Sequence, residues 1–292
     1  MSKLKVAIGP VLFLWQKSVM DSFYEQVAHS SADIVYLGES VCGKRRLSRQ
    51  EDYLRWASQL SEQGKQVVCS TLALLESPAQ VSALKKVCRD TSLLFEANDL
   101  AAVQVLSELN QPFVIGPAIN VYNGYTLMKL AKMGAKRWVM PVELSQTWLM
   151  ALKAEYASLC DLPMEYEVFS YGYLPLAYSA RCFTARHHDL AKDACDLICQ
   201  SHPQGLKTQS QDGKALFVLN GIQTMSGQIY NLCEEAAQLA DIADIARISA
   251  HQSEDMDWIE SFSGHRNTPR PANHINGYWH DLAGMASDAL KL

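Results

Sequence analysis

The sequence contains no apolar run close to the roughly 18 residues that a membrane-spanning helix requires. Its first residues do not pair a basic segment with a hydrophobic one, so we expect no signal peptide and a cytoplasmic protein. Cationic residues are not in surplus, because the sequence contains 26 Lys and Arg but 31 Asp and Glu. The resulting net charge of −5 argues against general nucleic-acid binding, which depends on neutralising phosphates.

Several enzyme motifs are also missing. No Gly-x-Gly-x-x-Gly fingerprint follows an early strand, which argues against a dinucleotide-binding fold. The motifs Gly-x-Ser-x-Gly of serine hydrolases and His-Glu-x-x-His of metalloproteases are absent as well, so peptidase activity is not supported. No low-complexity linker divides the 292 residues, and we therefore expect one domain over residues 1–292.

Short β-branched runs alternate with longer amphipathic stretches along the chain. The expected strands are Lys5–Gly9, Asp33–Leu37, Gln66–Ser70, Leu93–Ala97, Phe113–Gly116, Arg137–Met140, Glu165–Ser170 and Asp244–Ser249. The expected helices are Ser18–His29, Ser48–Gln63, Pro78–Arg89, Asp99–Leu109, Gly124–Met133, Ser145–Ser158 and Asp255–Ser263, with Ser48 and Ser145 as N-caps. Eight strands alternating with helices predict an α/β fold, a (β/α)8 TIM-barrel-like domain. An open doubly wound sheet is the alternative.

One segment, residues 172–221, interrupts this alternation after the seventh expected strand. Long irregular insertions in compact domains are usually functional or disordered, and the cysteines of this one favour a function. Within it, Ala215–Asn220 is typical of an added strand, which could form a hairpin with residues near Thr224.

Eight cysteines are many for a reducing compartment, where disulfides are rare and clustered thiols point to metal or redox chemistry. Cys182, Cys195 and Cys199 lie in the insertion, and iron–sulfur clusters require thiolates that converge in this way. Cys42 follows an expected strand by five residues. In a parallel barrel its loop would emerge at the same end as the insertion, which makes Cys42 the candidate fourth ligand. A structural zinc site and unrelated buried thiols remain alternatives.

The other cysteines are expected to be packing residues, with Cys69 on a strand, Cys88 and Cys233 in helices and Cys160 at a helix end. Polar residues near the expected strand ends are also site candidates. The basic group Lys44, Arg45, Arg46 and Arg49 could attract an anionic ligand or could form an exposed loop. Glu96, Asn98, Asn120 and Glu143 could act catalytically or could cap helices. The candidates for direct catalytic work are Arg45, Arg46, Asn120 and Glu143.

The segment from Glu167 to Phe183, EVFSYGYLPLAYSARCF, resembles the signature of peptidase family U32. That signature continues from Glu-Val-Phe-x-x-Gly through a first cysteine to Ser-Gly-Arg-Cys. Here Pro175 occupies the first cysteine position and Ala180 replaces the glycine, while Cys182 matches the second cysteine. The chain is similar over nearly its whole length to the branch of this family that acts in oxygen-independent ubiquinone biosynthesis. The stretches that carry this similarity are residues 9–12, 31–33, 36–39, 41–42, 44–46, 70–74, 140–145 and 217–227.

The resemblance implies a barrel-like fold and a [4Fe–4S] cluster held by Cys42, Cys182, Cys195 and Cys199. It also implies a heterodimer with a second family member, UbiU, that supports hydroxylation of the ubiquinone precursor ring without O2. A lipid-binding accessory protein, UbiT, and prephenate as the oxygen source belong to the same expectation. An alternative is a subunit whose cluster only supports folding of the complex.

Overall fold

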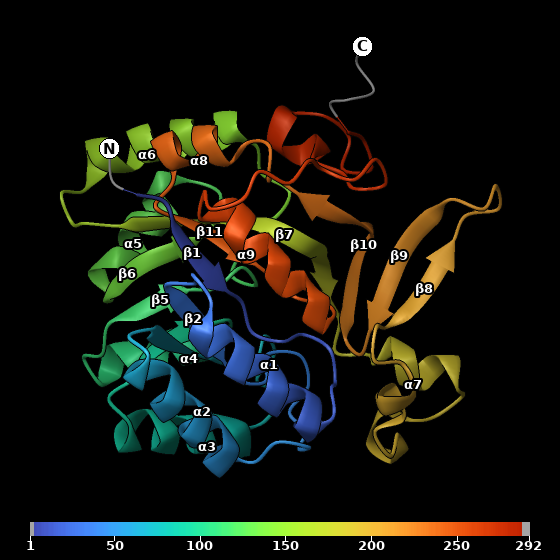
Figure 1. The fold of residues 1–292 in the computed structure, drawn as a ribbon. Helices are drawn as coiled ribbons and strands as arrows, with labels where there is room; N and C mark the ends of the chain where they lie inside the picture. The colour runs from blue at the N-terminus through green and yellow to red at the C-terminus, as the bar shows by residue number, and fades with distance from the viewer. Residues whose placement is uncertain (1–2, 288–292) are drawn as a thin grey trace.

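Eight parallel strands close into a barrel in the computed structural model, which describes residues 3–287 (Figure 1). The barrel strands are β1 (Lys5–Ile8), β2 (Ile34–Leu37), β3 (Gln66–Ser70), β4 (Leu94–Ala97), β5 (Phe113–Ile115), β6 (Ala135–Val139), β7 (Glu165–Tyr178) and β11 (Ile245–Ile248). They are hydrogen-bonded in sequence order, and the pairing of β11 with both β1 and β7 closes the ring. The predicted (β/α)8 barrel is therefore confirmed, and the open sheet is wrong.

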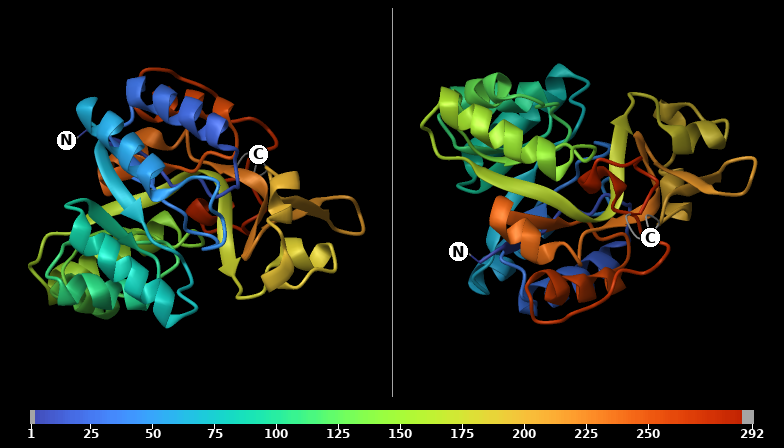
Figure 2. Two further views of the ribbon diagram at one scale, coloured as in Figure 1. Left: turned by 90° about the horizontal axis from the view of Figure 1, so that it is seen from below. Right: turned by 90° about the horizontal axis from the view of Figure 1, so that it is seen from above.

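Helices cover the outside of this barrel, as the two views of Figure 2 show. They are α1 (Lys17–His29), α2 (Gln50–Glu62), α3 (Pro78–Asp90), α4 (Leu100–Glu108), α5 (Gly124–Lys132), α6 (Gln146–Leu159) and α8 (Ala236–Ile242). Ser145 caps α6 as predicted, since its hydroxyl accepts a hydrogen bond from Trp148 N. The prediction for Ser48 is wrong, because α2 begins at Gln50 after Arg49. Among residues 3–287, no helix combines the length and apolarity needed to cross a bilayer.

The barrel interior contains buried charges as well as apolar side chains. Arg247 makes ion pairs with Glu96 at 2.7 Å and with Glu167 at 2.6 Å. The Tyr36 hydroxyl donates to Glu167 at 2.5 Å. Arg137 donates to the same hydroxyl and forms an ion pair with Glu167. Each charge therefore has an opposite partner, which buried ions require. Glu96, a candidate from the sequence, belongs to this interior network.

The expected seventh strand, Glu165–Ser170, ends too early, because β7 continues to Tyr178. Gly172 allows this continuation: its φ of +124° is accessible to glycine, and a Cβ there would meet the Ser249 carbonyl at 2.3 Å. Beyond this point β7 pairs antiparallel with β10 (Gln223–Asn231). β9 (Ala215–Asn220) and β8 (Leu206–Gln209) extend the sheet outward from β10. The predicted hairpin near Thr224 is confirmed as β9 and β10.

Short helical turns fill the chain between β7 and β8. They are α7 (Phe183–His187) and the 3-10 helices η1 (Lys192–Ala194) and η2 (Ile198–Ser201). In Figure 1 they lie together with β8–β10 at one side of the barrel. After β11 the chain forms η3 (Ser253–Met256), α9 (Asp257–Phe262) and η4 (Gly277–His280). The expected helix Asp255–Ser263 thus begins as a 3-10 turn.

Candidate functional site

The four candidate cysteines come from two distant parts of the chain. Cys42 lies in the loop between β2 and α2, as predicted. Cys182 is the N-cap of α7, Cys195 follows η1 and Cys199 lies in η2. All four are free and partly exposed. Both parts follow the carboxyl ends of parallel strands, where the functional sites of such barrels lie.

The pKa values of two of these thiols, Cys42 and Cys199, are each affected electrostatically by other candidate thiols. Burial raises the pKa of Cys42, the Arg45 charge opposes the rise, and the Cys182 thiolate adds to it. Burial also raises the pKa of Cys199, and a hydrogen bond and the charge of Arg45 oppose this, while Cys182 and Cys42 reinforce it. Arg45 therefore influences the thiols of both Cys42 and Cys199, which come from the two separate parts of the chain.

Lys44 brings the fourth thiol into the same group. Its ammonium group donates to the Lys192 carbonyl at 2.7 Å and to Asp193 Oδ1 at 2.8 Å, beside Cys195. The pKa of Lys44 is raised mainly by the Asp193 hydrogen bond, with smaller contributions from Cys195 and Cys42. The loop after β2 is thus joined by Lys44 to the turn that carries Cys195.

Arg45 is the buried centre of the site, with 6% of its surface exposed. Its Nη1 donates to the Leu12 carbonyl and its Nη2 to Asn220 Oδ1, both at 2.7 Å. Asn220 in turn donates through Nδ2 to the same Leu12 carbonyl at 2.8 Å. Arg45 therefore holds together the loops after β1 and β2 and the end of β9.

The turn after β9 also anchors α7, which carries Cys182 at its start. Gly221 donates its N–H to Thr184 Oγ1 at 3.0 Å and accepts the Phe183 N–H at 2.7 Å. A Cβ at Gly221, where φ is +62°, would lie 3.1 Å from Arg45 Nη2. An Asn-Gly pair is typical of a tight turn, but the contact of Asn220 with Arg45 joins residues 175 apart, which no local pattern indicates.

The other predicted catalytic candidates lie in different surroundings. Arg46 is exposed, and within residues 3–287 its side chain has no hydrogen-bond or ion-pair partner. Glu143 accepts a hydrogen bond from Tyr122, and Asn120 is exposed. Among the described residues, Glu143 and Asn120 make no hydrogen bond or ion pair with any of the four cysteines. Asn98 donates to the Thr71 carbonyl at 3.0 Å and to Glu96, so it supports the barrel rim.

Three of the remaining cysteines lie where the sequence predicted. Cys69 is on β3, Cys88 is buried in α3, and Cys160 is the C-cap of α6. The helical prediction for Cys233 is wrong, because it lies between β10 and α8. There Asn231 Oδ1 accepts the Cys233 N–H at 2.9 Å and forms a turn that competes with a helix.

No group of three or more His, Cys, Asp or Glu residues within 3–287 is placed to hold a single metal ion. The candidate site consists of four partly exposed thiols on two parts of the chain that Lys44 and Arg45 join. It is formed by a (β/α)8-barrel protein with a cysteine-bearing extension after its seventh strand.

A family model described as peptidase family U32 matches residues 20–257. The chain therefore belongs to peptidase family U32.

Solved structures with a similar fold include a U32 peptidase, at 11% identity over 86% of this chain and 94% of that chain, with a TM-score of 0.47. A tryptophan synthase from M. tuberculosis matches at 12% identity over 92% of this chain and 94% of its own, with a TM-score of 0.49. The tryptophan synthase alpha chain from Legionella pneumophila matches at 12% identity over 90% and 91%, with a TM-score of 0.47. The family assignment rests on the family model rather than on these matches.

Proposed function

We propose that this chain plays the part of UbiV, a [4Fe–4S] subunit that works with UbiU in oxygen-independent hydroxylation of the ubiquinone precursor ring. The observation that carries the proposal is that Lys44 and Arg45 bind the loop of Cys42 to the insertion that carries Cys182, Cys195 and Cys199. The similarity of the signature segment, with Pro175 in place of its first cysteine, supports the same branch of the family.

The residues of the site fit such a cluster in kind. Each thiolate of a [4Fe–4S] centre binds a different iron atom, so the four sulfurs lie farther apart than the ligands of one ion. Soft thiolates are also the ligands that iron–sulfur clusters use.

The two cations at the site suit a negatively charged group. Lys44 and Arg45 lie beside the thiols and would offset the charge of four thiolates. Arg45 Nε is a buried donor with no partner in residues 3–287, and hydrogen bonds to sulfur are one means by which proteins adjust such clusters. When bound, a cluster of this kind supplies one-electron transfer.

In this proposal the chain forms a heterodimer with UbiU, assisted by the lipid-binding protein UbiT, and prephenate is the oxygen source. Arg46 is exposed and has no hydrogen-bond or ion-pair partner among residues 3–287, so it is available to an anionic donor, whereas Arg45 is engaged by Leu12 and Asn220. A guanidinium group suits this role since it can bind a carboxylate through two parallel hydrogen bonds.

The test is anoxic purification of the native chain with UbiU, followed by iron and sulfide analysis of each subunit. We expect about four iron atoms in this subunit, as a [4Fe–4S] centre requires, and broad absorbance in the visible region. Cys42→Ser and Cys199→Ser should lose iron, whereas the control Cys160→Ser should keep it. A colourless protein with one bound zinc, or full iron in both variants, would contradict the proposal.

A second candidate is a subunit whose cluster only supports folding, and the burial of Arg45 among three segments favours it. The two candidates differ in one outcome. If Cys42→Ser keeps the heterodimer but loses hydroxylation, the cluster takes part in the reaction. If the heterodimer itself is lost, the folding role is the better description.

A further inference from the structure

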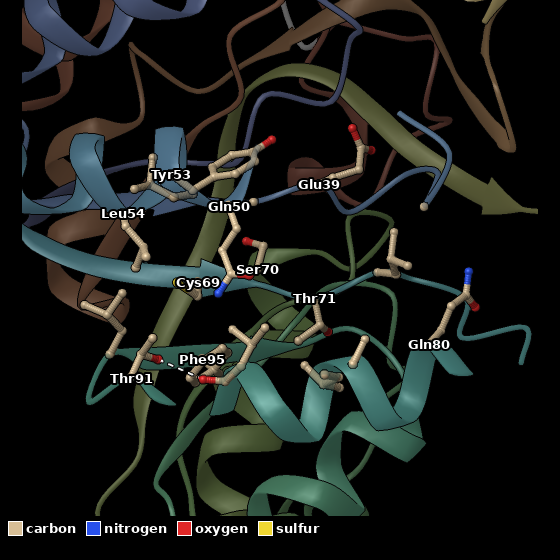
Figure 3. A pocket seen from close by; sticks show the side chains of 18 of the residues that line it. Glu39, Gln50, Tyr53, Leu54, Cys69, Ser70, Thr71, Gln80, Thr91 and Phe95 are labelled. Carbon is tan, nitrogen blue, oxygen red and sulfur yellow. Dashed lines mark hydrogen bonds between the residues drawn. The ribbon is translucent and has the colours of Figure 1, made fainter. Parts of the chain in front are cut away.

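A cavity of about 440 Å³ opens outside the barrel between α2 and α3, on the outer face of β3 and β4 (Figure 3). Gln50, Tyr53 and Leu54 line it from α2, and in Figure 3 Leu54 and Gln50 project from this helix toward β3. The opposite wall is α3, whose lining residues are Gln80, Ala83, Leu84 and Val87. This spacing matches one face of a helix, so α3 presents a continuous surface to the cavity.

The walls are apolar although the cavity is open to solvent. Leu72, Leu75 and Leu93 complete the lining, and all three are only partly buried. Leu54 remains 44% exposed. Apolar side chains that are left facing a concave space indicate a binding site, and cavities of about 300–1,000 Å³ accept small molecules.

The volume suits a small molecule. It lies within the range typical of small-molecule sites, so a ring system or a short hydrocarbon chain would fit.

The rim of the cavity belongs to the loop that carries Cys42. Gly43, Arg46 and Glu39 line the cavity from this loop. The Glu39 carboxylate is already held by the N–H groups of Val41 at 2.8 Å and Cys42 at 3.0 Å. Arg46 is exposed and has no partner within the described range, so it is the charge available to a ligand.

We propose that this cavity binds the hydrocarbon part of an amphiphilic small molecule, whose anionic group is held by Arg46 beside the Cys42 loop. The apolar walls supply most of the affinity, because removal of apolar surface from water is favourable. Arg46 supplies selectivity for a negatively charged end. The binding does not depend on a cluster at the thiols, but it uses Arg46, which the proposed function assigns to an anionic donor, so the two ligands would compete for this side chain.

The probe for this site is 1-anilinonaphthalene-8-sulfonate, an aromatic anion whose fluorescence rises when it is bound. The anoxically purified full chain is titrated with the sulfonate and, separately, with the uncharged N-phenyl-1-naphthylamine. Ala83→Phe fills the cavity from α3 and should weaken both probes at least tenfold. Ser82→Phe adds the same ring at the neighbouring exposed position, which does not line the cavity, and should change neither.

Arg46→Gln should weaken the sulfonate about fivefold or more and leave the uncharged probe unchanged. Circular dichroism and iron content of Ala83→Phe should match the wild type, so a failure here is separate from a failure of the cluster proposal. Equal binding by Ala83→Phe and wild type would overturn the proposal. Self-association that excludes the probe would do so too, since a second copy would then be the occupant.

Discussion

Arg45 shows most clearly how one side chain holds this site together. Its guanidinium group is buried and donates to the Leu12 carbonyl and the Asn220 amide. Hydrogen bonds that involve a charged group contribute more than neutral ones, and removal of one partner leaves the other unsatisfied. The sequence placed Arg45 in a basic loop and suggested ligand binding, because nothing local indicates a partner on β9.

We therefore expect Arg45→Met to destabilise the protein by roughly 3 kcal/mol, since it removes two charge-assisted hydrogen bonds and leaves Asn220 Oδ1 without its donor. Arg46→Met is the matched control, because Arg46 is exposed and surface substitutions usually stay within about 0.5 kcal/mol. Urea unfolding followed by circular dichroism measures both. A difference of less than about 1 kcal/mol between the two variants would mean that Arg45 does not join the loops energetically.

At the scale of elements, the alternation of β-branched runs and amphipathic stretches predicted the barrel strands and most of the helices. Ala215–Asn220 was predicted with its observed bounds as β9. The sequence could not predict the length of β7. Gly172 and Pro175 are typical of loops, yet both lie within the strand, because β10 supplies its new partners. α8 and β8 were also missed, since both are short and lie beside irregular segments.

The bend of β7 at Gly172 gives a prediction for this element. Gly172→Ala would place a Cβ 2.3 Å from the Ser249 carbonyl oxygen at a φ of +124°. We expect a loss of about 3 kcal/mol or more, since both strain and a backbone clash must be relieved. Gly264→Ala is the control, because a Cβ there meets nothing within 4 Å at a φ of +79°. It should cost only about 1 kcal/mol. Thermal unfolding midpoints compare the two, and equal losses would mean that β7 can shift at this point.

At the scale of the whole molecule, the candidate site depends on closure of the barrel. Cys42 and Cys182 are separated by 140 residues, and the order of the parallel strands brings their loops to one end. Sequence reasoning could place the loop of Cys42 and the insertion at one end of the barrel, because the loops that follow parallel barrel strands all lie at the same end. It could not place Lys44 against Asp193 or Arg45 against Asn220, because side-chain contacts across loops have no periodic pattern.

A ligand that joins these two parts of the chain should stabilise the whole fold. A group bound by the native state alone raises its stability by mass action. Removal of iron by an anoxic chelator should therefore lower the Tm of the purified chain, and reconstitution should restore it. Cys42→Ser should show the lower Tm with or without the chelator. An unchanged Tm after complete loss of iron would mean that the bound metal does not join the two parts.

β7 belongs both to the barrel and to the antiparallel extension of its sheet, since its first half pairs with β6 and β11 and its second half pairs with β10. A force applied to the outer sheet, for instance by a protein bound along β8, therefore reaches the barrel wall through an unbroken polypeptide backbone. Side-chain packing can slip under such a load, but consecutive peptide units cannot. A displacement of the antiparallel strands would therefore be transmitted to the barrel, and the cysteines of the extension would be displaced together with these strands.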